Sequence, residues 1–168
     1  MLLIASDDFR RLLNALKIDV NKQNSFGSTA LMLAAWQGQD RVVKLLLDYG
    51  ADVQLVDNLE ETAIHLALTS SGNERTAKLL VNGGADVNRR DRFGRSPLCL
   101  AVELGYEGVL DLLLDLKAGV NAQDLTFQNT ALHLACKDGN DKLIKLLLNA
   151  GADITKQNRY GETAFDIE

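Results

Sequence analysis

The sequence predicts an all-α solenoid built from paired helices, and three observations carry that prediction. A threonine or serine recurs at intervals of 33 or 34 residues, at Thr29, Thr62, Ser96, Thr130 and Thr163. Alanines and paired leucines follow the first four of these residues in a constant register. Glycines then divide each full unit into two short apolar segments. Repetition of this period along the whole chain indicates stacked structural repeats.

The first apolar segment of each unit is expected to form a short helix. Its threonine or serine stands directly before alanine-rich residues, where a helix N-cap belongs. Small alanines in this segment allow neighbouring units to approach closely: Ala34, Ala67, Ala101 and Ala135. Glycines are expected to end this helix and to begin a turn: Gly38, Gly72, Gly105 and Gly139.

The second segment is expected to form another helix, with one apolar face. Val42, Leu45 and Leu46 show the helical spacing in the first full unit. These leucines and their equivalents are expected to fill the space between units. Glycines suit the left-handed residue that follows such a helix, namely Gly50, Gly84 and Gly151. An extended arm then leads to the next unit.

Two recurring motifs resemble those of the ankyrin repeat family. One appears as TALMLA, TAIHLA, SPLCLA and TALHLA, and the other as GADVQ, GADVN and GADIT. The resemblance covers essentially the whole chain and implies a single domain, 1–168. It implies full repeats at 22–55, 56–88, 89–122 and 123–156, an N-terminal capping unit at 1–21, and a final unit at 157–168 that is cut inside its first helix. Antiparallel helix pairs are expected to stack in an arc, with β-turn or hairpin fingers projecting from them.

Some copies depart from the repeated pattern at glycine positions. Lys117 stands where a helix-ending glycine is expected, and Glu60 and Gln128 replace the finger glycine. A left-handed backbone at a residue other than glycine costs roughly 1 kcal/mol or more, so we expect the turn at Lys117 to be remodelled. Extra residues occur in TSSGN and in DLTFQN. The middle units are therefore expected to deviate in shape from the others.

Composition excludes several classes of function. The chain carries 18 lysines and arginines against 23 acids, a net charge of −5. It is therefore expected to bind neither nucleic acid nor an anionic membrane. Its start, MLLIASDD, does not resemble a signal peptide, and no apolar run is long enough to span a bilayer. With two cysteines, the chain is expected to be intracellular, in the cytoplasm or the nucleus.

The residues with catalytic potential favour structural roles. His65 and His133 stand three residues after a capping threonine, where an imidazole is able to bond the cap. Met32 and Cys99 hold the same slot, and neither is expected to replace that pairing well. One ligand per unit cannot close a zinc site, because a ligand atom must lie within about 2.1 Å of the ion. Cys136 is interpreted as a small buried thiol. We therefore expect no metal, no cofactor and no enzymatic activity.

The clearest functional signal is a row of large apolar residues at the finger tips. They are Phe26, Leu59, Phe93, Phe127 and Tyr160. Two interpretations stay open: each side chain packs on the neighbouring finger, or the row faces a groove where a partner binds. Trp36 and Leu104 lie in the variable turn after the first helix, which faces the groove in the family. Trp36 is the strongest candidate for a partner contact, because tryptophan is enriched at interface hot spots; the alternative is that its ring lies over Leu68 or Thr69 of the next unit.

A basic cluster surrounds Phe93 on the third finger. It includes Arg92 and Arg95, with Arg89 and Arg90 beside them. Such a cluster is able to bind an acidic peptide, a phosphate or a carboxylate. The alternative is a solvated loop in which Asp86 and Asp91 pair with the arginines.

A modification is also implied by the resemblance. LNALKIDVN and LVNGGADVN are similar to stretches that an asparaginyl hydroxylase modifies in ankyrin proteins, with Asn21 and Asn88 as the targets. The structural alternative has these side chains bond the backbone of the arm.

Together these features favour a non-catalytic protein–protein interaction module. Its concave groove, formed by finger tips and first-helix ends, is expected to bind a protein or peptide. The alternative is a structural spacer within a larger protein, in which the finger aromatics serve only packing between repeats. Self-association is possible, but the sequence does not predict it.

Overall fold

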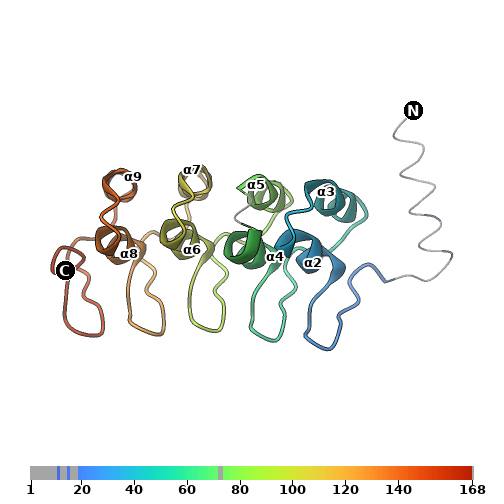
Figure 1. The fold of residues 1–168 in the computed structure, drawn as a ribbon, viewed down its shortest axis with the longest axis horizontal. Helices are drawn as coiled ribbons and strands as arrows, with labels where there is room; N and C mark the ends of the chain where they lie inside the picture. Colours follow the sequence, from blue (N-terminus) through green and yellow to red (C-terminus); the bar gives the residue numbers. More distant parts are fainter. Residues whose placement is uncertain (1–10, 12–14, 16–18, 72–73, 168) are drawn as a thin grey trace.

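The structure is a computed structural model, and it describes residues 11, 15, 19–71 and 74–167. Its helices form two parallel rows, and loops project from one side of the assembly (Figure 1). One row holds α2 (Ala30–Trp36), α4 (Ala63–Leu66), α6 (Pro97–Glu103) and α8 (Ala131–Lys137). The other row holds α3 (Asp40–Asp48), α5 (Glu74–Asn82), α7 (Glu107–Asp115) and α9 (Asp141–Asn149). The predicted all-α solenoid of helix pairs is confirmed.

The core runs along the contact between the two rows. In the first row the alanines Ala67, Ala101 and Ala135 are fully buried, because they lie where successive helices meet. In the second row Leu80, Leu113 and Leu147 occupy one repeated position and are also fully buried. Alanine on one helix and leucine on the next thus fill the junctions, as the sequence predicts.

Each first helix begins at the predicted cap. The Oγ atoms of Thr29, Ser96 and Thr130 accept the backbone N–H of the residue three positions later. Histidine completes the cap in two repeats: the Thr62 N–H donates to Nδ1 of His65 at 3.2 Å, and Thr130 bonds His133 likewise. The structural interpretation of both histidines is confirmed.

The other two occupants of this slot also take part in capping. The Thr29 N–H donates to Sδ of Met32 at 3.3 Å, and Ser96 Oγ donates to Sγ of Cys99 at 3.5 Å. The expectation that neither side chain replaces histidine well is therefore wrong for Met32. A thioether sulfur is a weaker acceptor than an imidazole nitrogen, but it reaches the same N–H.

The turn after each second helix keeps one geometry, whichever residue stands there. Gly50, Gly84 and Gly151 are left-handed, with φ of 83°, 92° and 86°. Lys117 adopts φ of 61°, and its N–H still donates to Leu114 O at 2.9 Å. The expected remodelling at Lys117 is wrong, because the hydrogen bonds that end the helix hold the backbone in place. Glu60 and Gln128 are left-handed in the same way, with φ of 60° and 57°.

The extra residues in TSSGN and DLTFQN each change the backbone only near the insertion. In the second repeat, α4 continues into a π-helical turn, η1 (Ala67–Ser71), which accommodates one more residue than an α-turn. In the fourth finger, the closing bond from Asp124 N to Asn129 O spans one residue more than the bond from Asp57 N to Glu61 O. The middle repeats therefore differ from the others at these two points.

The fingers are joined by a ladder of hydrogen bonds, which the sequence does not predict. A repeated aspartate or asparagine begins each finger, and its side chain accepts N–H groups of the same loop: Asn24, Asp57, Asp91, Asp124 and Asn158. The backbone carbonyl of the tip residue in each of the first four fingers then accepts an N–H from the next finger, as from Asn58 N to Phe26 O at 3.0 Å. The finger tips are thereby held at fixed positions relative to one another.

The C-terminal end of the described chain differs from the full repeats. The proposed capping unit, 1–21, lies largely outside the described residues. After Thr163 the described chain forms a single turn, closed by Asp166 N donating to Thr163 O, where the sequence predicts the start of a helix. Thr163 Oγ1 bonds Asp166 instead of a helix backbone. The exact repeat boundaries stay a prediction.

Candidate partner-binding surface

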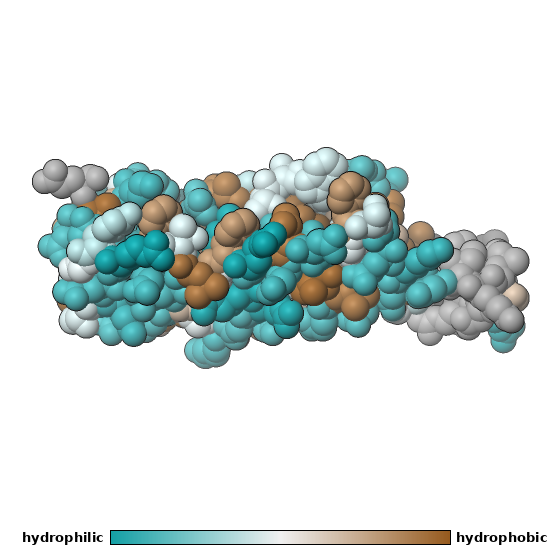
Figure 2. Space-filling view, turned by 90° about the horizontal axis from the view of Figure 1, so that it is seen from below, coloured by the Kyte–Doolittle hydropathy of each residue, from teal (hydrophilic) through white to brown (hydrophobic). Residues whose placement is uncertain are grey.

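The predicted row of large apolar finger tips is exposed to solvent. Phe26 and Tyr160 at the outer fingers are 72% and 67% exposed, and the three tips between them are 40% to 46% exposed. Figure 2 looks onto the finger tips, where hydrophobic patches interrupt a mainly hydrophilic face. Packing between neighbouring fingers therefore leaves a large part of every tip side chain uncovered.

Some tips nevertheless contact their neighbours. The rings of Phe127 and Tyr160 lie 6.5 Å apart between centroids and are tilted by 30°. The guanidinium groups of Arg95 and Arg92 lie 5.1 Å and 6.0 Å from the centroid of the Phe93 ring. Both interpretations of the row thus have support at particular residues, because these contacts orient the rings without burying them.

A pocket of about 290 Å³ lies between the third and fourth fingers. It brings together three predicted residues, Phe93, Arg95 and Phe127, with Glu103 at the end of α6 and Lys137 at the end of α8. Its remaining lining comes from Cys99, Asp124, Thr126, Asn129 and Leu134. The pocket thus joins finger tips to first-helix ends.

Side-chain size offers a reason why the pocket forms at this junction. Cys99 fills the slot that His65 and His133 occupy in the second and fourth repeats. Asn129 stands where the third finger has Arg95. Each replacement removes several side-chain atoms from the space between finger and helix, and a space opens where both occur together.

Other predicted residues lie outside that pocket. Trp36 is the last residue of α2 and is 49% exposed, and it shares its repeat position with Glu103 and Lys137. Leu104 follows α6 and is also exposed. Neither of them lines the pocket, nor do Phe26, Leu59, Arg92 and Tyr160.

The basic cluster on the third finger is partly neutralised. Arg95 Nη2 lies 2.7 Å from a carboxylate oxygen of Asp91 and 3.9 Å from Glu61. Arg90 donates to the carbonyls of Gly94 and Gln123. The solvated-loop alternative is therefore right about Asp91. In the part of the chain that the structure describes, Arg92 has no ion-pair partner.

Burial is the main influence on two titratable groups that interact with Arg95. Burial raises the pKa of the Glu61 carboxyl, and the negative charge of Asp57 raises it further, while Arg95 acts in the opposite direction. Burial lowers the pKa of the His65 imidazole. Arg95 thus lies between Asp91, with which it forms an ion pair, and Glu61, whose carboxyl group is easier to protonate than usual.

Comparison with known proteins decides the family. The family model described as "Ankyrin repeats (3 copies)" matches residues 1–91, 55–124 and 98–167. The chain belongs to the ankyrin repeat family. It is 36% identical over 143 residues to neurogenic locus notch homolog protein 1 of Mus musculus, and 37% identical over 142 residues to putative palmitoyltransferase ZDHHC13 of Danio rerio. These matches cover 85% and 83% of this chain but only 6% and 22% of the two proteins.

The two asparagines of the modification hypothesis take part in the ankyrin stack. Asn21 Oδ1 accepts from Asp52 N at 2.8 Å, and Asn88 Oδ1 accepts from Gly119 N at 2.7 Å. The structural interpretation, in which each side chain bonds the arm backbone, is confirmed. Hydroxylation of Asn21 or Asn88 stays a prediction.

The histidine, cysteine and acidic side chains of the described residues do not form a metal-binding cluster. Within the described ranges, no three histidine, cysteine or acidic side chains come together as metal ligands would. Cys99 is buried, whereas the prediction of a buried thiol is wrong for Cys136, which is only partly buried. Burial raises the pKa of both thiols, which keeps them protonated. Among the helices that the structure describes, none is long and apolar enough to cross a membrane.

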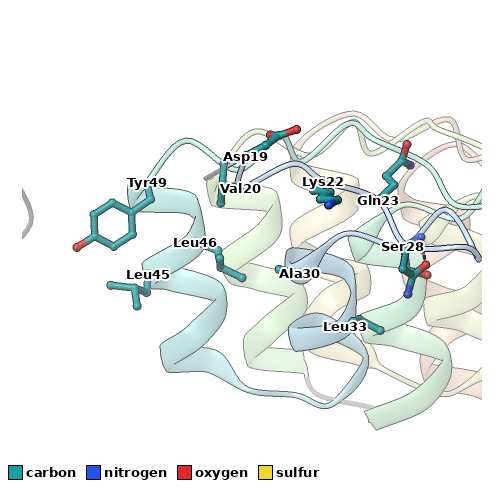
Figure 3. Close-up of a pocket in the computed structure, with 11 residues that line it drawn as sticks. Asp19, Val20, Lys22, Gln23, Ser28, Ala30, Leu33, Leu45, Leu46 and Tyr49 are labelled. Carbon is teal, nitrogen blue, oxygen red and sulfur yellow. Dashed lines mark hydrogen bonds between the residues drawn. The ribbon is translucent and has the colours of Figure 1, made fainter. Parts of the chain in front are cut away.

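A larger pocket, of about 490 Å³, lies at the N-terminal end of the described repeats (Figure 3). Leu45 and Leu46 of α3 line it together with Ala30 and Leu33 of α2. In later repeats the equivalents of Ala30 and Leu46 are buried, because the preceding repeat covers them. This pocket is therefore the stacking surface of the ankyrin repeat itself, left uncovered by the described residues.

Proposed function

We propose that this chain is a non-catalytic protein-binding module, and that its partner contacts the finger tips and the first-helix ends. Ankyrin repeats generally mediate protein–protein interactions. The observation that carries the proposal for this surface is the exposure of all five tip side chains together with Trp36. Large apolar groups that remain exposed in a row favour an interface rather than a solvated surface.

Two further observations support the absence of catalysis. The imidazoles of His65 and His133 are engaged in helix caps, and both thiols are held in the protonated form. The free thiols also favour a reducing compartment, so we place the module inside the cell. The palmitoyltransferase named among the relatives is about four and a half times as long as the matched segment, which covers 22% of it, and its activity is attributed to that protein alone.

The test compares the double variant Trp36→Ala/Phe93→Ala with the wild type in quantitative pull-downs from cell extract. Truncation of a hot-spot residue costs on the order of 2 kcal/mol of binding free energy, so proteins captured by the wild type should be lost. Leu148→Ala is the matched control, because Leu148 is an exposed leucine of α9, in the other helix row. Equal capture by all three proteins, with unchanged circular dichroism, would show that the surface is wrongly assigned.

The alternative is a structural spacer, and the contact between Phe127 and Tyr160 favours it. If packing between fingers is the main role of the row, Phe127→Ala/Tyr160→Ala should lower the unfolding midpoint while partner capture stays intact. Under the binding proposal, the same variant loses capture before it loses stability.

A further inference from the structure

The pocket between the third and fourth fingers is shaped to receive one side chain. Its volume of about 290 Å³ is at the lower limit of ordinary small-molecule sites, which begin near 300 Å³. Phe93 and Phe127 stand on its two finger walls, and Cys99 and Leu134 contribute from the helices below. Two aromatic walls on the finger side favour an apolar or aromatic group in the pocket.

Both aromatic walls are held in place by neighbouring side chains. Arg95 lies over the Phe93 ring at 5.1 Å and is itself anchored by Asp91 at 2.7 Å. Tyr160 of the fifth finger contacts the Phe127 ring at 6.5 Å. A pocket whose walls are already oriented loses little side-chain entropy when a ligand enters, which favours binding.

The fingers around this pocket are basic, although the whole chain is acidic. The third and fifth fingers carry six cations: Arg89, Arg90, Arg92, Arg95, Lys156 and Arg159. The acids of the third, fourth and fifth fingers are engaged inside the loops. Asp91 binds Arg95, Asp124 accepts backbone N–H groups, and Glu162 accepts from Asn158. With six cations against these three acids, the three fingers together carry a net positive charge.

The second finger provides the opposite charge. It carries Asp57, Glu60 and Glu61, and Glu60 at its tip is exposed. A negatively charged ligand is thus repelled from the second finger and attracted to the third. On the described part of the third finger, neither Arg89 nor Arg92 has an ion-pair partner, so both are available to a ligand.

We propose that this pocket binds an acidic peptide segment of a partner protein, whose one large apolar side chain inserts between Phe93 and Phe127. The inference rests on the proposed function and specifies its partner. Acidic residues on either side of the inserted group pair with Arg92 and Arg89 on one finger and with Lys156 and Arg159 on another. Glu103 and Lys137, at the helix end of the pocket, offer an acceptor and a donor to the peptide main chain.

Single-stranded nucleic acid is the competing ligand, because bases also stack on aromatic rings beside arginines. The observations favour the peptide. Glu103 lines the pocket, Glu60 is exposed on the adjacent finger, and the net charge of the chain is −5. A phosphate backbone carries one charge at every nucleotide and would meet these acids along its path, whereas a peptide is able to place uncharged residues opposite them.

The experiment uses fluorescein-labelled synthetic peptides and fluorescence anisotropy with the full chain. The probe has a central tryptophan flanked on each side by three glutamates. One matched peptide replaces the tryptophan by serine, a second replaces the glutamates by lysines, and a single-stranded oligothymidine serves as the competing probe. Binding of the acidic tryptophan peptide should be roughly tenfold tighter than that of either matched peptide, and it should weaken as salt screens the charges.

Variants of the chain assign the binding to this pocket. Arg92→Glu and Phe127→Ala should each weaken the acidic tryptophan peptide by roughly tenfold. Lys44→Glu makes the same charge change on α3, in the other helix row, and should leave the affinity unchanged. Preference for the oligothymidine, or equal loss in Lys44→Glu, would overturn the proposal. If no peptide binds while Trp36→Ala/Phe93→Ala still abolishes partner capture, the acidic-peptide inference fails and the proposed function stands.

Discussion

Lys117 shows how a solenoid imposes a backbone conformation on an unsuitable residue. Its φ of 61° lies in the left-handed region, where an L-residue with a β-carbon costs about 1–2 kcal/mol. The equivalent Gly151, with φ of 86°, avoids this cost. The helix end is determined by hydrogen bonds from the following residues, so the chain retains the turn and bears the strain.

Replacing Lys117 by glycine should therefore stabilise the protein. We expect Lys117→Gly to raise the free energy of unfolding by about 1 kcal/mol, measured by urea denaturation. The reverse exchange, Gly151→Lys, should lower it by a similar amount, because a Cβ at Gly151 has no atom within 4 Å and only backbone strain changes. No difference between Lys117→Gly and the wild type would mean that the left-handed lysine is relaxed.

At the level of the helix, one capping slot accepts three kinds of side chain. His65, Met32 and Cys99 occupy it in different repeats, and the first two accept the N–H of the capping threonine. The slot requires a group that is buried and uncharged. A histidine there meets that requirement only while its imidazole is neutral.

Stability should consequently depend on the protonation of His65. Burial lowers its pKa in the folded state, so the unfolded chain binds the proton more readily. The contribution of neutral His65 is present above its ordinary pKa, near 6.5, and is lost as the pH falls through the lower folded value. His65→Met, which copies the first repeat, should lose less stability than the wild type between about pH 8 and pH 5 in urea denaturation.

The comparison of the two proteins isolates this histidine, because other groups titrate in both of them. Glu61 works in the opposite direction, since its raised pKa favours the folded state at low pH. Identical slopes of unfolding free energy against pH in the wild type and in His65→Met would contradict the assignment.

The sequence predicts the helices well and the fingers poorly, for a physical reason. Helices are determined by local signals, such as Thr130 before an apolar segment and Gly139 after it, and these lie within one repeat. An aspartate in a loop is usually exposed, so the sequence places Asp91 in a solvated loop as one alternative, whereas its side chain is buried and accepts N–H groups of its own finger. The pocket depends on Cys99 and Asn129, two small side chains that are 30 residues apart in the chain. Predicting it requires knowing which side chains face each other across a junction.

On the scale of the whole molecule, stability accumulates at the junctions between repeats. Side chains of one repeated position bridge adjacent fingers at three of these junctions. Gln23 Nε2 donates to Gly27 O within its own finger and to Val56 O in the next, and Gln123 repeats the pattern with Gln128 and Gln157. Arg90 serves the same purpose between the third and fourth fingers. Val56 holds this position in the second finger and has no side-chain donor.

Val56→Gln should supply the bridge to the third finger. Each hydrogen bond contributes about 0.5–1.5 kcal/mol, and part of that gain is offset by the lost apolar contacts of valine, so we expect a net stabilisation of about 1 kcal/mol. Gln123→Val, the reverse exchange at an existing bridge, should destabilise by a similar amount. Thermal and urea unfolding of both variants measure the effect, and a destabilised Val56→Gln would show that valine is preferred for its packing.

The bonds between finger tips also have a consequence for the sequence of any bound partner. Because each tip carbonyl is tied to the next finger, the spacing of the tip side chains follows the stacking of helices, roughly 10 Å per repeat. An extended chain advances about 3.3 Å per residue, so it passes one finger roughly every three residues. The finger tips therefore match every third residue of an extended peptide. For a partner that runs along the fingers, the spacing of its apolar residues should matter as much as their identity.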